Sequence, residues 1–213
     1  MGIFGLKKLF GRKKTIEQII LERLPFGKYR IVGYAVTGRY AELMYPSWKE
    51  MPMVCPYCHT RYGNIPDLNY TLDRRGADMY YTYDCFCIVS GSFKKFCEKN
   101  GYENLKFTKF NECNFYFFES LGAFKIDIHS PYTFVGYHCP HCGNHTQICG
   151  MISKDEGFEL PSDDYILSSD NYFGSYERKN PAIIVGLETK KKMKKYGLKG
   201  LSFTPVLASE TAL

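Results

Sequence analysis

The chain has 213 residues, of which 45% are hydrophobic and 23% are charged, and this balance excludes a wholly disordered protein. Lysines and arginines number 28 against 22 acidic residues, so the formal net charge is +6, which permits nucleic acid or an anionic membrane as a partner but requires neither. A chain of this length can bury a hydrophobic core without needing disulfides or metal ions, as one large domain or two small ones.

Residues 1–27 are predicted to form a basic arm followed by an amphipathic helix. The arm, residues 1–14, mixes basic and apolar side chains, which is typical of a mobile arm or of a weak contact with a membrane surface; we favour the mobile arm. Thr15 and Gln18 form a capping box at the start of the helix. Because no secretory signal and no apolar run of about 18 residues is visible, we expect a cytoplasmic protein without a transmembrane helix.

The next part of the chain is predicted to be β-structure with a cysteine pair in a loop. Residues 28–45 are rich in β-branched and aromatic types broken by glycines, which predicts two strands that could pair as a hairpin. Cys55-Pro-Tyr-Cys58 follows and leads into a polar loop. Residues 79–89 are apolar enough to predict a buried strand, and residues 114–128 predict one or two more strands.

Two segments of the chain resemble each other. Residues 88–108 (IVSGSFKKFCEKNGYENLKFT) and 184–204 (IVGLETKKKMKKYGLKGLSFT) align without a gap and are identical at 9 of 21 positions. Each predicts a strand, a short helix ended by glycine, and a second strand, and such self-similarity indicates duplicated units. The predicted fold class is therefore α+β, with two related strand–helix–strand halves, near 50–118 and 134–208, in one domain of residues 28–213.

A Cys-x-x-Cys motif precedes each of these units. Cys55-Pro-Tyr-Cys58 and Cys139-Pro-His-Cys142-Gly143 together offer the four soft ligands that tetrahedral Zn²⁺ prefers, with Zn–S near ~2.3 Å. We therefore predict a structural zinc that joins the two halves. Four protein ligands leave no open position for water, so this zinc would not be catalytic.

Other residues near the motifs are assigned plainer roles. The remaining five cysteines have no ligand spacing and are predicted to be small buried hydrophobic residues. The neighbouring histidines are predicted to lie on the surface or to support the ligands rather than to replace one. These histidines are His59, His138, His141 and His145.

A dithiol oxidoreductase is an alternative, because Cys-Pro-Tyr-Cys is also the active-site tetrapeptide of glutaredoxins. That chemistry needs Cys55 at a helix N-terminus, where the pKa of its thiol is lowered. The residues after Cys58 include Gly63 and Pro66 and do not predict a helix, and this interpretation leaves the second pair unexplained. No nucleophile elbow, P-loop, zinc-protease or dinucleotide motif is present, so we do not predict an enzyme.

Two charged segments are candidate contact surfaces. A lysine cluster at 190–199 could contact the phosphates of nucleic acid, although we favour a solvated helix face. An acidic loop at 154–164 is the weaker candidate for contact with a basic protein partner. The nucleic-acid alternative would use Lys190, Lys191 and Lys194, and the protein contact would use Asp155, Glu156, Glu159, Asp163 and Asp164.

The paired motifs and the C-terminal segment resemble the double-CXXCG family, which is linked to bacterial polymorphic-toxin immunity proteins. The resemblance covers roughly 50–208 and rests on both cysteine pairs, Gly143 and residues 182–206; His59 stands where the family has glycine. It implies a non-enzymatic cytoplasmic protein that binds and neutralises a cognate toxin, and we expect it to act by covering the toxin's active site.

Overall fold

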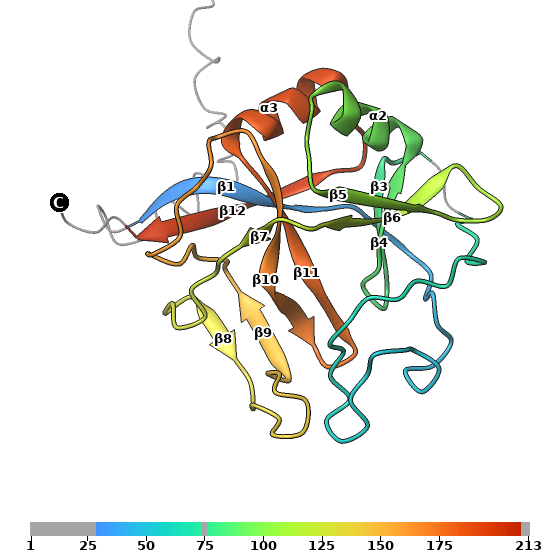
Figure 1. Cartoon of the computed structure of the whole chain (residues 1–213), viewed down its shortest axis with the longest axis vertical. Coiled ribbons are helices and arrows are strands. Elements are labelled where there is room, and N and C mark those ends of the chain that lie inside the picture. Colours follow the sequence, from blue (N-terminus) through green and yellow to red (C-terminus); the bar gives the residue numbers. More distant parts are fainter. Residues whose placement is uncertain (1–28, 74–75, 210–213) are drawn as a thin grey trace, which may run out of the picture.

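The computed structural model describes residues 29–73 and 76–209, which form two β-sheets with two helices beside them (Figure 1). The first sheet has the strand order β12-β1-β11-β10-β9-β8, with β7 beside β10. Its strands are β1 (Tyr29–Thr37), β7 (Ala123–Phe124), β8 (Thr133–Val135), β9 (Gln147–Gly150), β10 (Ile166–Ser175), β11 (Arg178–Val185) and β12 (Ser202–Ser209). The predicted basic arm and N-terminal helix lie outside the described residues.

The second sheet has the order β2-β3-β4-β6-β5. Its strands are β2 (Arg39–Ala41), β3 (Met79–Thr82), β4 (Cys87–Ser90), β5 (Leu105–Lys109) and β6 (Phe115–Ser120). The helices are α2 (Gly91–Lys99) and α3 (Leu187–Tyr196). The chain is thus a mixed α and β protein, as the sequence predicted, and strands predominate in it.

Each helix connects two strands of one sheet in the same way. Along the chain, α2 connects β4 to β5, and α3 connects β11 to β12. In each sheet the two connected strands are separated by one strand, which is antiparallel to both. That intervening strand is β6 in one sheet and β1 in the other. Gly101 and Gly197 follow the two helices with φ of +70° and +85°, the left-handed conformation that ends a helix and suits glycine.

Both helices pack into one core that the two sheets share. Phe93 and Cys97 of α2 are buried, as are Thr189 and Met193 at the corresponding positions of α3. This core also takes side chains from β1, β3, β4, β6, β10 and β11. The helices therefore lie at one end of the molecule, and the β2–β3 and β8–β9 connections lie at the other (Figure 1). Neither helix in the described residues is long and apolar enough to cross a membrane.

The hairpin suggested for residues 28–45 is wrong, because β1 and β2 belong to different sheets. Gly38 separates them, and a Cβ atom at this position would lie 2.2 Å from the carbonyl oxygen of Met79. The chain can therefore pass close against β3 only where it has no side chain. Beyond this crossing, β2 pairs in parallel with β3.

The single strand predicted for residues 79–89 is two strands, β3 and β4, joined by a tight turn. Cys85 adopts φ +64° in this turn, and the backbone N–H of Phe86 donates to the Thr82 hydroxyl at 2.8 Å. The apolar composition of the segment concealed the turn, because it contains neither glycine nor proline. Residues 114–128 do contain two strands, β6 and β7, which carry the chain from one sheet to the other.

Candidate metal centre

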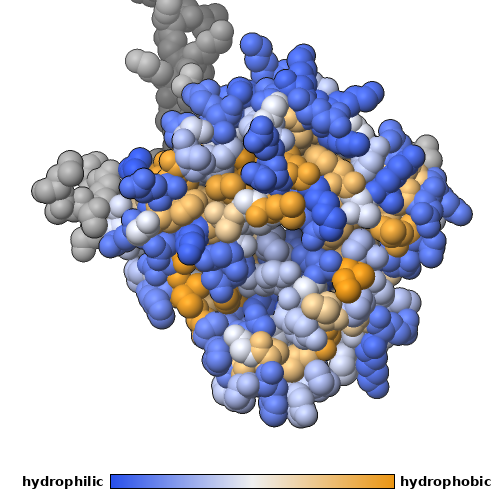
Figure 2. All heavy atoms as spheres, in the orientation of Figure 1, coloured by the Kyte–Doolittle hydropathy of each residue, from blue (hydrophilic) through white to orange (hydrophobic). Residues whose placement is uncertain are grey.

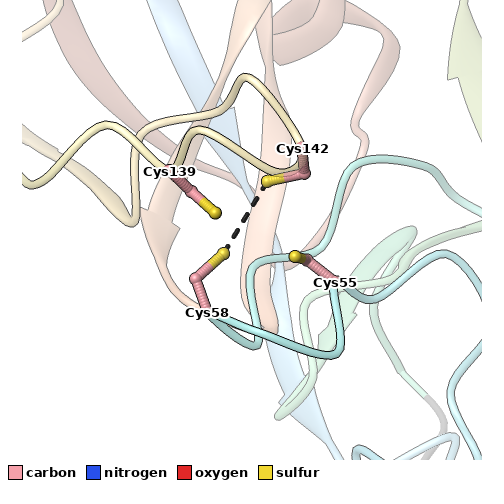
Figure 3. A group of neighbouring side chains, drawn as sticks. All are labelled: Cys55, Cys58, Cys139 and Cys142. Carbon is pink, nitrogen blue, oxygen red and sulfur yellow. Dashed lines mark hydrogen bonds between the residues drawn. The ribbon is translucent and has the colours of Figure 1, made fainter.

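The first cysteine pair lies in a tight hairpin, here called knuckle 1, whose base is an isolated bridge between Val54 and Arg61. The backbone N–H of Cys55 donates to the carbonyl of Thr60 at 2.9 Å. The N–H of His59 donates to the carbonyl of Cys55, also at 2.9 Å. These bonds turn both cysteine side chains of the hairpin toward the same side (Figure 3).

The second pair lies in knuckle 2, which has the same hydrogen bonds. Its base is a bridge between His138 and His145. The N–H of Cys139 donates to the carbonyl of Asn144, and the N–H of Gly143 donates to the carbonyl of Cys139, both at 2.9 Å. The two knuckles therefore share one backbone arrangement although 84 residues separate their second cysteines.

The residue after the second cysteine is left-handed in both knuckles. Gly143 has φ +69° and His59 has φ +57°. A side chain in this conformation costs roughly 1–2 kcal/mol, so glycine is the expected residue there. The His59 ring stacks on Trp48 at 4.0 Å between ring centroids, a contact that offsets part of this cost. The change from glycine to histidine in knuckle 1 thus leaves the shape of the hairpin intact.

The four cysteines meet, as predicted from their spacing. The sulfur atoms of Cys55, Cys58, Cys139 and Cys142 lie within 4.8 Å of one another, and those of Cys58 and Cys142 are 3.7 Å apart (Figure 3). Cys55 and Cys139 are each only 2% exposed, whereas Cys58 and Cys142 are half-buried. This group could hold a metal ion, and within the described ranges it includes no histidine.

Aromatic side chains of the two knuckles form ring pairs near the cysteines. Tyr57 and His141 occupy the same position in the two knuckles, and their rings stack at 3.8 Å with an interplanar angle of 11°. His138 and His145 form a second ring pair at 5.1 Å. The predicted role of the histidines as neighbours of the ligands therefore agrees with their positions.

Backbone N–H groups and burial set the pKa values of the cysteine thiols. The N–H of Cys142 hydrogen-bonds to the Cys139 sulfur and, against the opposing effect of burial, lowers the pKa of Cys139 to about 7. Burial raises the pKa of Cys142 to about 11. Burial also opposes ionisation of Cys55, but N–H groups of its own knuckle and neighbouring thiols outweigh it and lower the pKa of Cys55. A metal ion bound to all four sulfurs must therefore displace the proton of Cys142 at neutral pH.

The other five cysteines are not part of this group. Cys87 and Cys97 are buried in the core, and burial raises the pKa of Cys87 to about 12. Cys85, Cys113 and Cys149 are half-buried. The first two therefore have the buried hydrophobic role that the sequence suggests, and the others are only partly enclosed.

Two buried cationic side chains beside the knuckles were missed by the sequence-based prediction. Arg61, 1% exposed, closes the base of knuckle 1 and donates to the carbonyls of Asp84, Cys85 and Lys179. Lys179, 2% exposed, lies on β11 and its Nζ donates to the carbonyl of His145 at 2.6 Å. Lysine and arginine are mostly exposed and are almost never fully buried unless they are paired. A sequence-based prediction therefore places them on the surface.

The acidic loop has both exposed and engaged carboxylates. Glu156, Glu159 and Asp163 are exposed, and Asp155 is half-buried with Oδ1 accepting from a backbone N–H of its own turn. Asp164 accepts hydrogen bonds from Tyr102, Thr189 and Lys192, which ties the loop to α3. Asp164 therefore holds the loop in place, and the exposed carboxylates are the ones that a partner could reach.

Replacing Asp164 by alanine is expected to lower the free energy of unfolding by about 1–2 kcal/mol at pH 7, because three donors lose their acceptor. Burial opposes ionisation, but the hydrogen bonds from Lys192 and Tyr102 outweigh it and lower the pKa of Asp164. The ionised carboxylate therefore stabilises the fold at pH values above the pKa that Asp164 has in the unfolded chain. Below about pH 4, the free energies of unfolding of wild type and variant should become more similar. Urea denaturation at pH 7 and pH 3 measures this; Asp163→Ala is the control, and equal losses in both variants would contradict the assignment.

The lysine cluster is only partly a solvated face. Lys190 is buried, with Nζ 3.3 Å from the centroid of the Tyr34 ring. Lys191 is exposed and paired with Glu188 at 2.6 Å, and Lys194 is exposed. The surface over α2 and α3 is nevertheless largely hydrophilic (Figure 2). The three candidate lysines thus differ in their surroundings, and Lys190 faces the core.

The chain matches no protein-family model, and the search of curated proteins found no match to it. The resemblance to the double-CXXCG family therefore rests on the knuckle residues and the C-terminal segment alone.

Proposed function

We propose that this protein is a non-enzymatic immunity protein, stabilised by zinc, that binds a cognate bacterial toxin and covers its active site. The observation that carries the proposal is the group of four cysteine sulfurs, supplied in pairs by two knuckles of the same shape. A centre with four protein ligands has no open position for substrate or water. Its contribution is therefore to stability, and the resemblance to the double-CXXCG family supports a binding role.

Zinc is the metal that we propose for this centre. Four thiolates are soft ligands that select zinc over magnesium or calcium. In a tetrahedral site with Zn–S near ~2.3 Å, neighbouring sulfurs lie ~3.8 Å apart. The separation of 3.7 Å between Cys58 and Cys142 fits this size. Cys55, Cys58, Cys139 and Cys142 would hold the ion, which would supply the positive charge that keeps all four sulfurs ionised.

We also propose that the molecule consists of two related halves, each with one knuckle. The knuckles share their hydrogen bonds, and the orders β4-β6-β5 and β11-β1-β12 are matched, each with its helix connection. In this interpretation β1, from residues 29–37, completes the half that contains the C-terminal segment. The zinc would then join the halves at one end of the molecule while the shared core joins them at the other.

The affinity for zinc is expected to fall as the pH falls, because protons compete for the thiolates. The pKa of Cys142, about 11, requires proton release on binding at any neutral pH. Cys139, with a pKa of about 7, adds a second released proton only below that pH. A plot of log affinity against pH should therefore be steeper by about one proton below pH 7 than above it. Competition with a chelator of known affinity, from pH 6 to pH 9, measures the slope; an unchanged slope would contradict the assignment.

The nucleic-acid alternative would use the lysines of α3. The arrangement of these lysines does not favour simultaneous contact with one phosphate backbone, because Lys190 lies against Tyr34 and Lys191 is paired with Glu188. The alternative predicts binding that weakens steeply with salt. Charge reversal of Lys190, Lys191 and Lys194 should abolish that binding, and should leave protection against a toxin intact if the immunity proposal is right.

The dithiol alternative would use Cys55 as a nucleophile. Cys55 is 2% exposed, and residues 56–58 form a turn that is followed by irregular chain and not by a helix. Both features differ from the exposed thiol at a helix N-terminus that this chemistry requires. Alkylation of the zinc-loaded protein separates the cases: protection of Cys55 until the metal is removed supports the closed centre.

The decisive experiment combines co-purification and protection. The protein is co-expressed with the product of the adjacent gene, and we expect the two to purify as a complex and cell growth to be restored. Charge reversal at the exposed carboxylates Glu156 and Asp163 tests the acidic loop as the contact surface, with Glu103→Lys, an exposed residue outside that loop, as the control. Growth that is not restored, or a gene without a toxic neighbour, would count against the immunity proposal.

A further inference from the structure

Lys179 is a buried ammonium group without a carboxylate partner. Its side chain projects from β11 and is 2% exposed, and its Nζ donates to the carbonyl oxygen of His145 at 2.6 Å. No acidic side chain of the described ranges forms an ion pair with it, although five other ion pairs are present there. A buried charge normally has an opposite charge nearby, because its transfer from water costs several kcal/mol. Within the described ranges, no aspartate or glutamate lies close enough to Lys179 to supply this opposite charge.

Knuckle 2 is the part of the candidate metal centre that contacts this ammonium. His145, which accepts its hydrogen bond, closes the base of knuckle 2. Burial lowers the pKa of Lys179, and the charges of Cys142, Cys149 and Cys58 act in the opposite direction. Cys58 and Cys142 belong to the group of four sulfurs, whereas the thiol of Cys149 lies outside it and donates to the carbonyl of Gly174 at 3.6 Å.

We propose that Lys179 is the counter-ion of the metal–thiolate centre: its ammonium group, held against knuckle 2 by the carbonyl of His145, offsets part of the negative charge that four thiolates and a divalent ion carry together. This inference rests on the proposed zinc centre. Four thiolates and one divalent ion carry a net charge of −2, and Lys179 neutralises half of it. In the protein interior this attraction is stronger than in water. Lys179 is a positioning residue, since it acts through the ligands and does not bind the ion.

The same charge has opposite effects on the two forms of the protein. With the ion bound, the ammonium offsets part of the net charge of −2 of the centre. Without the ion, this charged centre is not formed, and Lys179 retains one carbonyl as its partner. Because such coupling is reciprocal, the lysine favours the ion to the same extent that the ion favours the charged lysine. Removal of the charge should therefore weaken metal binding without weakening the metal-free fold.

The test compares three variants of the full chain. Lys179→Gln removes the charge and keeps a donor for His145, and Lys179→Met removes both. Lys154→Gln is the matched control, because its Nζ also donates to carbonyls, those of Asp155 and Phe158, but lies in the acidic loop. Zinc affinity is measured by competition with a chelator, and thermal unfolding is followed with the metal removed. We expect about a 10–100-fold loss of zinc affinity for Lys179→Gln, wild-type affinity for the control, and no loss of stability in the metal-free form.

Several outcomes would overturn the proposal. Equal zinc affinities of Lys179→Gln and Lys154→Gln would show that the charge has no effect on the centre. Equal destabilisation of the metal-free and zinc-bound forms would make Lys179 a packing residue only. If Lys179→Gln does not fold, Lys179→Met takes its place, and failure of both to fold with zinc in excess would also contradict the counter-ion role. A wild-type protein that binds no zinc would instead disprove the centre itself.

Discussion

Replacement of Cys139 by serine is expected to abolish stoichiometric zinc binding. It should also lower the melting temperature more than the same replacement at any of the five cysteines that do not belong to the four-sulfur group. Cys139 is 2% exposed and supplies one of four sulfurs that lie within 4.8 Å of one another. Three remaining thiolates bind zinc more weakly, and the serine hydroxyl stays protonated at neutral pH. Because the two knuckles come from distant parts of the chain, loss of the ion also removes the connection between them.

The size of this effect depends on how much of the folding free energy comes from the ion. Small structural zinc sites have apparent binding free energies of about 10–16 kcal/mol, but this chain also has a buried core that needs no metal. We therefore expect the serine variant to fold with a melting temperature lower by more than 10 °C, since about 1 kcal/mol corresponds to 2–4 °C for a chain of this size.

The control is Cys113→Ser, a half-buried cysteine that is not part of the four-sulfur group. It should retain one zinc per chain and a melting temperature close to that of wild type. Elemental analysis of the purified proteins gives the metal content, and scanning calorimetry gives the melting temperature. One zinc per chain in the Cys139 variant, or no zinc in wild type, would contradict the centre described above.

The knuckles could be predicted from sequence because their structure is local. A Cys-x-x-Cys spacing brings two sulfurs to one side of a turn, and the left-handed position that follows is signalled by Gly143 in knuckle 2. In knuckle 1 the same position is His59, so its conformation was not signalled there. The two pairs are far apart in the sequence, so their meeting could not be predicted from local structure. It was predicted because a structural zinc ion needs four ligands.

The packing of charged side chains could not be predicted in the same way. Lys190 belongs to a helix whose lysines suggest a solvated face, yet its ammonium lies 3.3 Å from the ring centroid of Tyr34, far away in the sequence. Periodicity places a residue on a helix face but does not identify the residue from another strand that covers it. Lys179 and Arg61 were missed because their partners are backbone carbonyls. Every residue has such a carbonyl, so the sequence does not mark which ones will bind a buried cation.

The turn between β3 and β4 shows a second limit. Apolar composition predicts burial for both a continuous strand and a tight hairpin, and glycine or proline normally distinguishes them. Here the hairpin is stabilised by a side-chain hydrogen bond from the backbone of Phe86 to Thr82 and by the left-handed Cys85. Neither residue type signals a turn strongly, so the difference appears only in the structure.

The second large effect is expected for Arg61→Ala, which should lower the free energy of unfolding by about 3–5 kcal/mol. The guanidinium donates to carbonyls of Asp84 and Cys85 in the β3–β4 turn and of Lys179 on β11, so one side chain connects knuckle 1 to both sheets. Alanine would leave these carbonyls without a donor and open a cavity against Phe86, whose ring centroid lies 4.5 Å from the guanidinium carbon.

Lysine cannot replace this arginine, because a single ammonium on a flexible stem does not reach three carbonyls as the planar guanidinium does. We therefore expect Arg61→Lys to be nearly as unstable as Arg61→Ala. Arg178→Ala is the matched control: Arg178 is exposed, and its pair with Glu177 at 3.7 Å contributes less than about 1 kcal/mol. Urea denaturation compares the three variants, and a loss for Arg61→Ala no larger than that for Arg178→Ala would show that the connection is dispensable. Because Arg61 also closes the base of knuckle 1, its loss should weaken zinc binding even though the residue is not a ligand.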